Sequence, residues 1–147
     1  MSVTFTRAAP ADETALREMM QAFYAGERLR FDPACAAALR ELLENPALGI
    51  VTLIRRDGQI AGYAVLTFSY SLERGGKTAL LDELFIVPEH RRHGLATAAV
   101  HRAIADARAH ACRALHLEVD HANAPAQALY AHAGFATEGR DFWTLRW

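Results

Sequence analysis

The chain has 147 residues, a typical length for one domain, so we expect a single domain over residues 1–147. Hydrophobic residues make up 52% of it and charged residues 22%, which is the composition of a folded protein and excludes a disordered one. The chain has 16 Lys and Arg against 17 Asp and Glu, a net charge of -1, and this near-balance argues against a general nucleic-acid binder.

The sequence also predicts a protein without a membrane span. It contains no run of about 18 apolar residues, the length that a membrane-spanning helix needs. Residues 1–13 lack the basic stretch followed by an apolar stretch that marks a secretory signal. Cys35 and Cys112 form no CxxC pair, and we interpret both as free thiols in a reducing, cytoplasmic setting.

The first half of the chain shows strand and helix patterns in turn. Asp32 before Pro33 is the strongest helix start, because aspartate caps helix N-termini and proline suits the first helical position. Asp57 and Gly58 predict a tight hairpin turn. In chain order, we expect a strand at 3–6, helices that begin at Pro10 and at Asp32, and strands at 49–54 and 60–70.

The second half alternates strands and helices. In chain order, we expect a strand at 79–87, a long helix that begins at or near Gly94, a strand at 115–119, a short helix at 124–131, and strand-like segments at Phe135 and 142–147. Grouped antiparallel strands followed by strand–helix–strand units predict an α/β or α+β fold with helices on both faces of one sheet.

A basic turn joins the strand at 79–87 to the long helix. The first turn of a helix has unpaired N–H groups and the positive end of the helix dipole. Gly94 and Ala96 are small enough for a phosphate to approach the backbone, and Arg91 and Arg92 add positive charge. The turn has neither the GxGxxG pattern nor the Gly-Lys-Ser/Thr of a P-loop. It therefore predicts an anion site, with a solvated basic helix entrance as the alternative.

Two motifs are similar to those of a known family. The pattern Arg91-x-x-Gly94-x-Ala96 resembles R/Q-x-x-G-x-G/A, and the strand end at 84–88 resembles L-x-V-x-P. Residues 123–135 resemble N-x-x-A-x-x-L-Y-x-x-x-G-F. Their order and separation are those of the GNAT superfamily of N-acetyltransferases, and the chain resembles this family over residues ~50–147. The layout looks closest to enzymes that acetylate small amines, such as the diamine and polyamine acetyltransferases.

The resemblance implies a fold and an activity. The fold would be a mixed, mostly antiparallel sheet of six to seven strands with about four helices, splayed where acetyl-CoA enters. The activity would be acetyl transfer from acetyl-CoA to a primary amine of a small molecule or peptide, by direct attack in a ternary complex. A homodimer is left open. The alternative is a non-catalytic acyl-CoA-binding or sensor domain, while the net charge disfavours an acetyltransferase that acts on aminoacyl-tRNA.

The resemblance also implies an acetyl-CoA site. Strand residues 84–86 would present backbone groups to the pantetheine and thioester, residues 92–97 would wrap the pyrophosphate, and residues 123–126 would hold the pantetheine arm. His90 replaces the family's usual aromatic residue and Arg92 its usual glycine, which narrows the freedom of the loop. The implied cofactor-binding residues are Leu84, Phe85, Ile86, Arg91, Arg92, His93, Gly94, Leu95, Ala96, Thr97, Asn123, Ala124, Pro125, Ala126 and Tyr130.

Acetyl transfer to an amine needs a proton acceptor, because a free alkyl amine has a pKa near ~10 and attacks only when neutral. Asp82 and Glu83 interrupt an apolar strand, where a charge is costly without a partner or a purpose. Adjacent strand residues point to opposite faces, so we expect one of the two to meet the substrate. We favour Glu83 as base or water-relay partner and Asp82 as substrate anchor or backup base. Ion pairs with arginines are the alternative.

Three further expectations complete the site. The resemblance implies that Tyr130 is the general acid for the CoA thiolate; a packed helix tyrosine is the alternative. Tyr24, Glu27 and Arg28 lie where the family's substrate loop would be, so they are candidates for substrate binding, with solvated or packing roles as the alternative. The seven histidines form no HExxH motif or Cys/His set, so we expect no metal.

Overall fold

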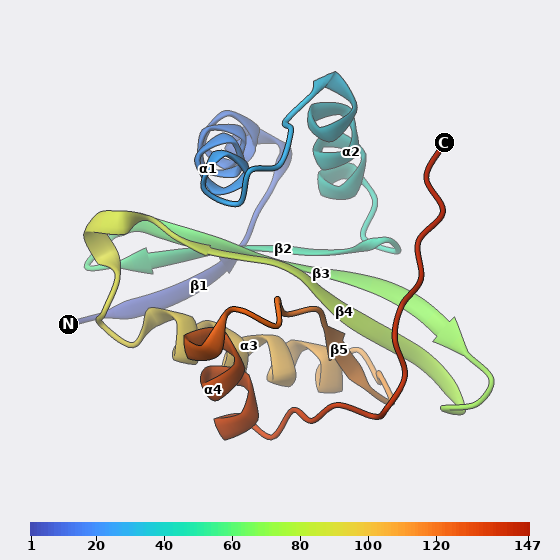
Figure 1. Ribbon diagram of the computed structural model, residues 1–147. Helices are drawn as coiled ribbons and strands as arrows, with labels where there is room; N and C mark the ends of the chain where they lie inside the picture. The colour runs from blue at the N-terminus through green and yellow to red at the C-terminus, as the bar shows by residue number, and fades with distance from the viewer.

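A five-stranded sheet runs through the middle of the molecule, with helices on both faces (Figure 1). The structure is a computed structural model that describes residues 1–147. Neighbouring strands are antiparallel except β4 and β5, which are parallel, and the spatial order is β1-β2-β3-β4-β5. The strands are β1 (Val3–Arg7), β2 (Gly49–Arg56), β3 (Gln59–Ser71), β4 (Gly76–Ile86) and β5 (Leu115–Leu117). The helices are α1 (Glu13–Gly26), α2 (Pro33–Glu44), α3 (Leu95–Ala109) and α4 (Ala124–His132), with short 3-10 turns at Pro10–Asp12 and Pro88–His90.

The mixed, mostly antiparallel sheet and its four α-helices agree with the expected fold, but the strand count was wrong. The sheet has 5 strands rather than six to seven, because Phe135 and residues 142–147 lie outside it. A strand-like pattern becomes a strand only against a neighbouring strand. Ion pairs of Glu138 and Arg140 hold the preceding segment at the β3–β4 turn, and residues 142–147 find no partner strand.

Apolar side chains pack on both faces of the sheet. Residues of α1 and α2 cover one face of the sheet, where they pack against alternate residues of β2 and β3. We call it the α1/α2 face. Residues of α3 and α4 cover the other, the α3/α4 face. Strands that are buried on both sides read as continuous apolar runs, and β2 is such a strand. No helix combines the length and apolar character needed to cross a membrane.

Two local signals formed the expected structures. The Asp32 carboxylate accepts a hydrogen bond from the Cys35 N–H at 3.1 Å and caps α2. Asp57 and Gly58 adopt φ values of 51° and 82°, the left-handed pair that a two-residue hairpin turn requires.

A β-bulge at Asp82 changes which face the rest of β4 presents. Leu81 pairs with Leu66 and Glu83 pairs with Val65, so Asp82 has no partner on β3. Leu81 packs on the α3/α4 face, whereas Glu83 is bonded to side chains of the α1/α2 face. Simple alternation would put both on one face. Our assumption of regular alternation at Asp82 and Glu83 was therefore wrong, because the extra residue of a bulge re-aims the side chains that follow it.

The pairing of β4 with β5 stops at the same point. It joins residues 79–81 to residues 115–117, and β5 ends at Leu117 rather than at the expected Val119. From Asp82 to Ile86, the edge of β4 that faces β5 therefore has no strand beside it. We call this opening the gap.

Candidate active site

Glu83 lies beside this gap with its carboxylate held by two tyrosines. The Tyr24 hydroxyl, from α1, donates to Oε2 at 2.5 Å, and the Tyr63 hydroxyl, from β3, donates to Oε1 at 2.7 Å. Burial raises the pKa of Glu83, the two hydrogen bonds oppose this shift, and the charge of Asp82 adds to it. Burial and the Glu83 carboxylate raise the pKa of both tyrosines, so each keeps its proton and donates it.

Tyr63 is a residue of this site that the sequence analysis missed. It is fully buried, with 0% of its surface exposed, and its ring lies 6.1 Å from that of Phe85. A buried tyrosine hydroxyl needs a polar partner, and Glu83 is the partner here. The available signal was a tyrosine in an apolar strand that is predicted to pair with the strand holding Asp82 and Glu83.

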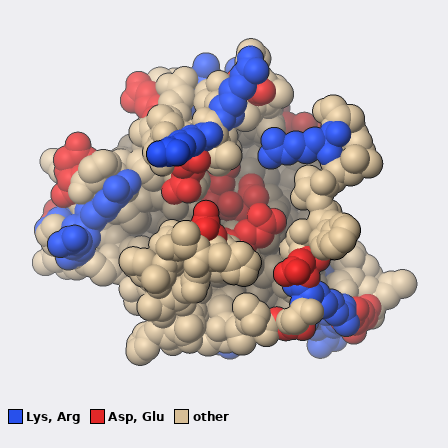
Figure 2. All heavy atoms as spheres, in the orientation of Figure 1, with Lys and Arg blue, Asp and Glu red and all other residues tan.

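A hollow opens at the centre of one face of the molecule, and acidic side chains gather in it (Figure 2). Asp82, Glu83 and Glu118 lie close enough for their charges to interact: Glu118 acts on Asp82, and Asp82 acts on Glu83. Partial desolvation and then the charge of Glu118 raise the pKa of Asp82, whose side chain is still accessible to solvent. Neither Asp82 nor Glu83 forms an ion pair with an arginine. The arrangement suits a positively charged ligand.

Tyr130 lies on α4, in the apolar cluster that contains Leu81, and is half-buried. Its ring packs edge-on against Phe135 at 6.1 Å, and burial raises its pKa. No group of the protein hydrogen-bonds its hydroxyl. The hydroxyl oxygen is accessible to solvent. Such a hydroxyl keeps its proton at neutral pH and is free to donate it.

The first turn of α3 offers backbone donors beside the gap. The Ala98 N–H donates to the Gly94 carbonyl at 3.0 Å, so the N–H groups of the three residues before it have no partner within the helix. Arg92 and Gly94 have φ values of 61° and 76°. A Cβ added at Gly94 would meet nothing within 4 Å, so the backbone there is open to a ligand.

Two of the residues implied for acetyl-CoA binding also hold the local structure of the chain. Arg91 Nε donates to the Ile86 carbonyl at 2.9 Å, and its guanidinium lies 5.6 Å from the centre of the Phe85 ring. The Asn123 side chain caps α4 by accepting from the Ala126 N–H at 3.2 Å. Arg91 therefore braces the end of β4, and Asn123 fixes the start of α4.

The three candidate substrate residues do not lie together. Tyr24 reaches Glu83, whereas Glu27 and Arg28 are exposed beyond the end of α1 and make no side-chain hydrogen bond. Arg28 has a φ of 55°, which turns the chain away from the helix.

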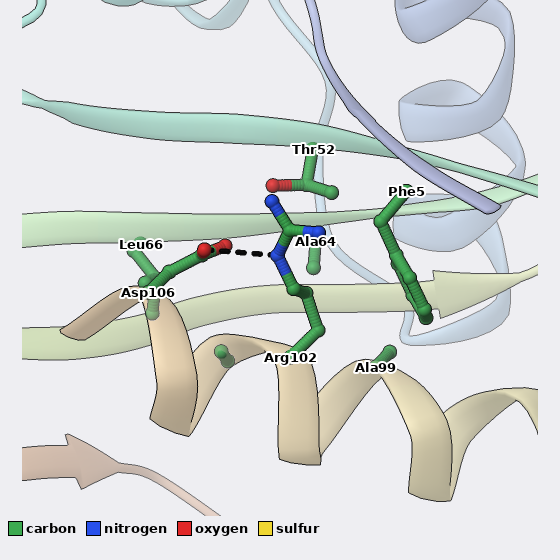
Figure 3. Close-up of a pocket in the computed structure, with 8 residues that line it drawn as sticks. Phe5, Thr52, Ala64, Leu66, Ala99, Arg102 and Asp106 are labelled. Atoms are coloured by element: carbon green, nitrogen blue, oxygen red, sulfur yellow. Dashed lines mark hydrogen bonds and ion pairs between the residues drawn. The ribbon is translucent and has the colours of Figure 1, made fainter. Parts of the chain in front are cut away.

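A small cavity elsewhere belongs to the packing of α3 (Figure 3). Its volume is about 10 Å³, roughly the space of one water molecule, so it is no substrate site. Arg102 Nε bonds to Asp106 at 2.8 Å beside it, and the guanidinium lies 5.8 Å from the centre of the Phe5 ring. No group of three or more His, Cys, Asp or Glu side chains is placed to hold a metal ion.

A sequence profile of the acetyltransferase (GNAT) family matches residues 14–135. The chain belongs to this family. It is 32% identical over 104 residues to an uncharacterized N-acetyltransferase of Mycobacterium bovis, a match that covers 71% of this chain and 63% of the relative. It is 33% identical over 85 residues to a streptothricin acetyltransferase of Streptomyces lavendulae, covering 58% of this chain and 43% of the relative. This chain therefore spans less than two thirds of the length of either relative.

Solved GNAT-like structures superpose over nearly all of the chain. An integron cassette protein from the Cole Harbour Salt Marsh metagenome has a TM-score of 0.86 and 29% identity, covering 97% of this chain and 89% of that one. A predicted acetyltransferase with acetyl-CoA from Clostridium acetobutylicum has a TM-score of 0.81, covering 99% and 96%; at 16% identity it shows the fold alone. The resemblance drawn from the two motifs is confirmed.

Proposed function

We propose that this GNAT domain transfers the acetyl group of acetyl-CoA to a primary amine of a small molecule or peptide by direct attack in a ternary complex. One observation carries the proposal. A half-buried carboxylate, Glu83, lies on β4 where that strand loses its neighbour, so an acceptor and a donor that enters the gap would meet beside it.

The donor would be held mainly by backbone. The unpaired edge of β4 at 82–86 offers N–H and C=O groups to the pantetheine arm, as strand addition does for extended ligands. The free N–H groups and the dipole of the first turn of α3 would bind the pyrophosphate, with Arg92 adding positive charge. Acetyl-CoA supplies the activated acetyl group.

Glu83 would accept the proton of the attacking amine. The ammonium group must lose a proton before nitrogen can attack, and a carboxylate with a raised pKa is a better acceptor at neutral pH than an ordinary one. Tyr63 is fully buried and fixes Oε1 from inside. The less buried Tyr24 leaves the other side of the carboxylate as the approach for the acceptor.

Tyr130 would return a proton to the leaving thiolate. Its hydroxyl is free of protein partners and stays protonated, because burial raises its pKa. A thiolate that receives this proton leaves without a net charge in the gap.

Asp82 and Glu118 would bind a second positive charge of the acceptor. Their mutual repulsion is relieved when a cation lies between them. The acceptor panel should therefore include diamines, polyamines and aminoglycosides next to monoamines, amino acids and peptides. Streptothricin belongs in it because a streptothricin acetyltransferase is among the relatives.

Release of CoA from acetyl-CoA, measured over this panel, tests the proposed function. We expect release with at least one amine. Binding of acetyl-CoA without release for any acceptor would support the non-catalytic acyl-CoA-binding domain instead, and no binding would overturn both.

A matched pair of variants tests where the donor binds. Gly94→Glu places bulk and negative charge at the first turn of α3, and we expect it to weaken acetyl-CoA binding at least ~10-fold in calorimetry. Gly58→Glu is the control, because Gly58 has a similar φ of 82° and equally open surroundings in the β2–β3 turn. Equal affinities of the two variants would contradict the placement.

A further inference from the structure

A groove separate from the candidate active site lies between α1 and α2, which run side by side over one face of the sheet (Figure 1). Its volume is about 350 Å³, within the ~300–1,000 Å³ that small-molecule sites have. All of its lining residues fall within 17–40, so the two helices and the segment between them form it without any strand. The groove therefore shares no residue with β4, where Asp82 and Glu83 lie.

Arg17 brings a free positive charge to the groove. The neighbouring Arg40 donates two hydrogen bonds to the Glu13 carboxylate, at 2.9 and 3.3 Å, whereas Arg17 forms no ion pair. The hydrogen bonds of Arg40 lower the pKa of Glu13, partial desolvation opposes them, and the charges of Arg40 and Arg17 lower it further. Because both arginines act on Glu13, they lie at the same end of the groove. Glu13 is held by Arg40, so the five N–H donors of Arg17 remain available.

Next to this charge the groove offers an apolar surface. Ala36 and Ala37 of α2 contribute nothing larger than a methyl group, and Phe31 contributes a half-buried ring. The exposed Gln21 adds an amide that can donate a hydrogen bond. The planar fork of an arginine matches the two oxygens of a carboxylate. The groove therefore suits a molecule with a carboxylate at one end and an apolar body.

Asp32 limits this molecule to one acidic group. Its side chain lines the groove while its carboxylate accepts a hydrogen bond from the Cys35 N–H at 3.1 Å. This hydrogen bond is the largest cause that lowers the pKa of Asp32, so the carboxylate is ionised at neutral pH. A second acidic group in the groove would meet a negative charge of the protein, which disfavours it.

We propose that the groove between α1 and α2 binds a small organic monocarboxylate, with the carboxylate on Arg17 and the apolar body against Phe31, Ala36 and Ala37. This proposal goes beyond the proposed acetyl transfer and does not depend on it. A carboxylate without an apolar body would leave this surface in water, and a neutral molecule would leave Arg17 without a partner. Both should bind more weakly than a molecule that has both parts.

Two aromatic rings separate this groove from Glu83. The Phe31 ring lies edge-on to Tyr24, with 5.6 Å between the ring centres, and the Tyr24 hydroxyl donates to Glu83. A ligand in the groove would touch Phe31 without reaching Glu83. The proposed site is therefore a second site, and its ligand should not compete with CoA at the gap.

Titration of phenylacetate into the full-length protein, labelled with ¹⁵N and followed by NMR, tests the proposal. We expect saturable shifts of the Gln21 side-chain amide and of the backbone amides of Ala36 and Ala37. Phenylacetamide lacks the charge, acetate lacks the ring, and phenylsuccinate adds a second carboxylate. Each of these three should bind at least ~10-fold more weakly than phenylacetate. An excess of CoA should leave the shifts caused by phenylacetate in place.

Two matched pairs of variants locate the site. Arg17→Met keeps a long side chain and removes the charge, so the dissociation constant of phenylacetate should rise at least ~10-fold. Arg108→Met, at an exposed arginine of α3 that forms no ion pair, should leave it unchanged. Ala37→Phe should fill the groove and weaken binding, whereas Ala38→Phe, at the next residue of α2 but outside the groove, should not. All four residues are exposed, so the core is left intact.

Four results would overturn the proposal. One is the absence of saturable shifts with phenylacetate. Another is equal binding of phenylacetamide, which would show that the carboxylate plays no part. The third is equal affinity of phenylacetate for the two members of either variant pair. The fourth is displacement of phenylacetate by CoA, which would place it at the first turn of α3 instead.

Discussion

Glu83 combines burial with two hydrogen bonds, and these have opposite effects on its charge. Burial raises its pKa, while the Tyr24 and Tyr63 hydroxyls lower it. The carboxylate must be ionised to accept a proton, so activity should fall as pH drops through this raised pKa. In the proposed reaction, the two tyrosines would thus help to set the lower end of the working pH range.

Removal of one tyrosine hydroxyl should move that limit. In Tyr63→Phe, a hydrogen bond that stabilises the ionised Glu83 is lost, so we expect the acidic limb of kcat/KM to move to higher pH. Tyr70→Phe, at an exposed tyrosine of β3, is the control and should leave the profile in place. An unchanged acidic limb in Tyr63→Phe would exclude this role of the Tyr63 hydroxyl.

Glu83→Gln removes the proposed proton acceptor. We expect kcat/KM to fall by roughly 10²–10⁴ at neutral pH and to recover partly above pH ~9, where the amine is neutral in solution.

Tyr130→Phe tests the proposed acid. The variant keeps the ring packed against Phe135 and removes only the free hydroxyl, so stability and acetyl-CoA affinity should be retained. We expect the single-turnover rate to fall by roughly 10²–10⁴ if chemistry limits it. A wild-type rate would leave Tyr130 with a packing role.

Arg92 stands in a conformation that suits glycine. Its φ of 61° is left-handed, and most side chains are strained there. Arg92→Gly should therefore raise the free energy of unfolding, by up to about 1 kcal/mol. Arg108→Gly, inside α3, should lower it by about 1 kcal/mol, because glycine is a poor helix former. Urea unfolding of both variants measures the two signs, and a loss in both would refute the assignment of strain to Arg92.

At the scale of elements, the close approach of β3 and β4 holds the site together. A Cβ at Gly62 would lie 2.2 Å from the Phe85 carbonyl oxygen, so any larger residue must push the two strands apart. β3 supplies Tyr63 and β4 supplies Glu83, and this spacing sets the hydrogen bond between them.

Gly62→Ala should lower the free energy of unfolding by at least about 1–3 kcal/mol, because a well-packed strand pair has no room for the methyl group. Gly26→Ala is the control: a Cβ at this last residue of α1 meets nothing within 4 Å, and alanine favours the helix. Thermal unfolding compares the two. A neutral Gly62→Ala would mean that the strands separate without cost.

The elements that could be predicted from the sequence are those with local causes. The Asp32 cap, the Asp57-Gly58 turn and the apolar runs of β2 and β3 depend on neighbouring residues and on burial. The bulge at Asp82, the partner of Tyr63 and the position of residues 142–147 depend on which strands meet, and no local pattern states this. The sequence therefore supplied candidate residues by type, while the orientation of their side chains could not be predicted from it.

At the scale of the whole molecule, the near-neutral net charge conceals an uneven distribution. The total is -1, yet acidic side chains gather in a hollow on one face of the molecule (Figure 2). The charge of Glu118 acts on Asp82, and that of Asp82 acts on Glu83. A concave surface with charges of one sign attracts ligands of the opposite sign, and dissolved salt screens this attraction. The acceptor should therefore be selected by charge as well as by its reactive amine.

Ionic strength should reveal this selection. We expect KM for a diamine acceptor to rise with salt, and KM for a monoamine of equal length to rise less. Asp82→Asn should raise KM for the diamine with little loss in kcat, and should reduce the salt dependence. Steady-state kinetics at low and high salt measure all three. Equal salt dependence for both amines would contradict a binding role of the hollow.

The bulge at Asp82 also adds a residue to β4 without changing the face of Glu83. Leu81 and Glu83 pair with the adjacent residues Leu66 and Val65, so they lie on opposite faces although they are two positions apart in the sequence. Deletion of Asp82 would leave this pairing in place and keep Glu83 toward Tyr24 and Tyr63. The additional residue therefore gives the strand a second carboxylate at the point where its pairing with β5 ends, without turning the first one away from the two tyrosines.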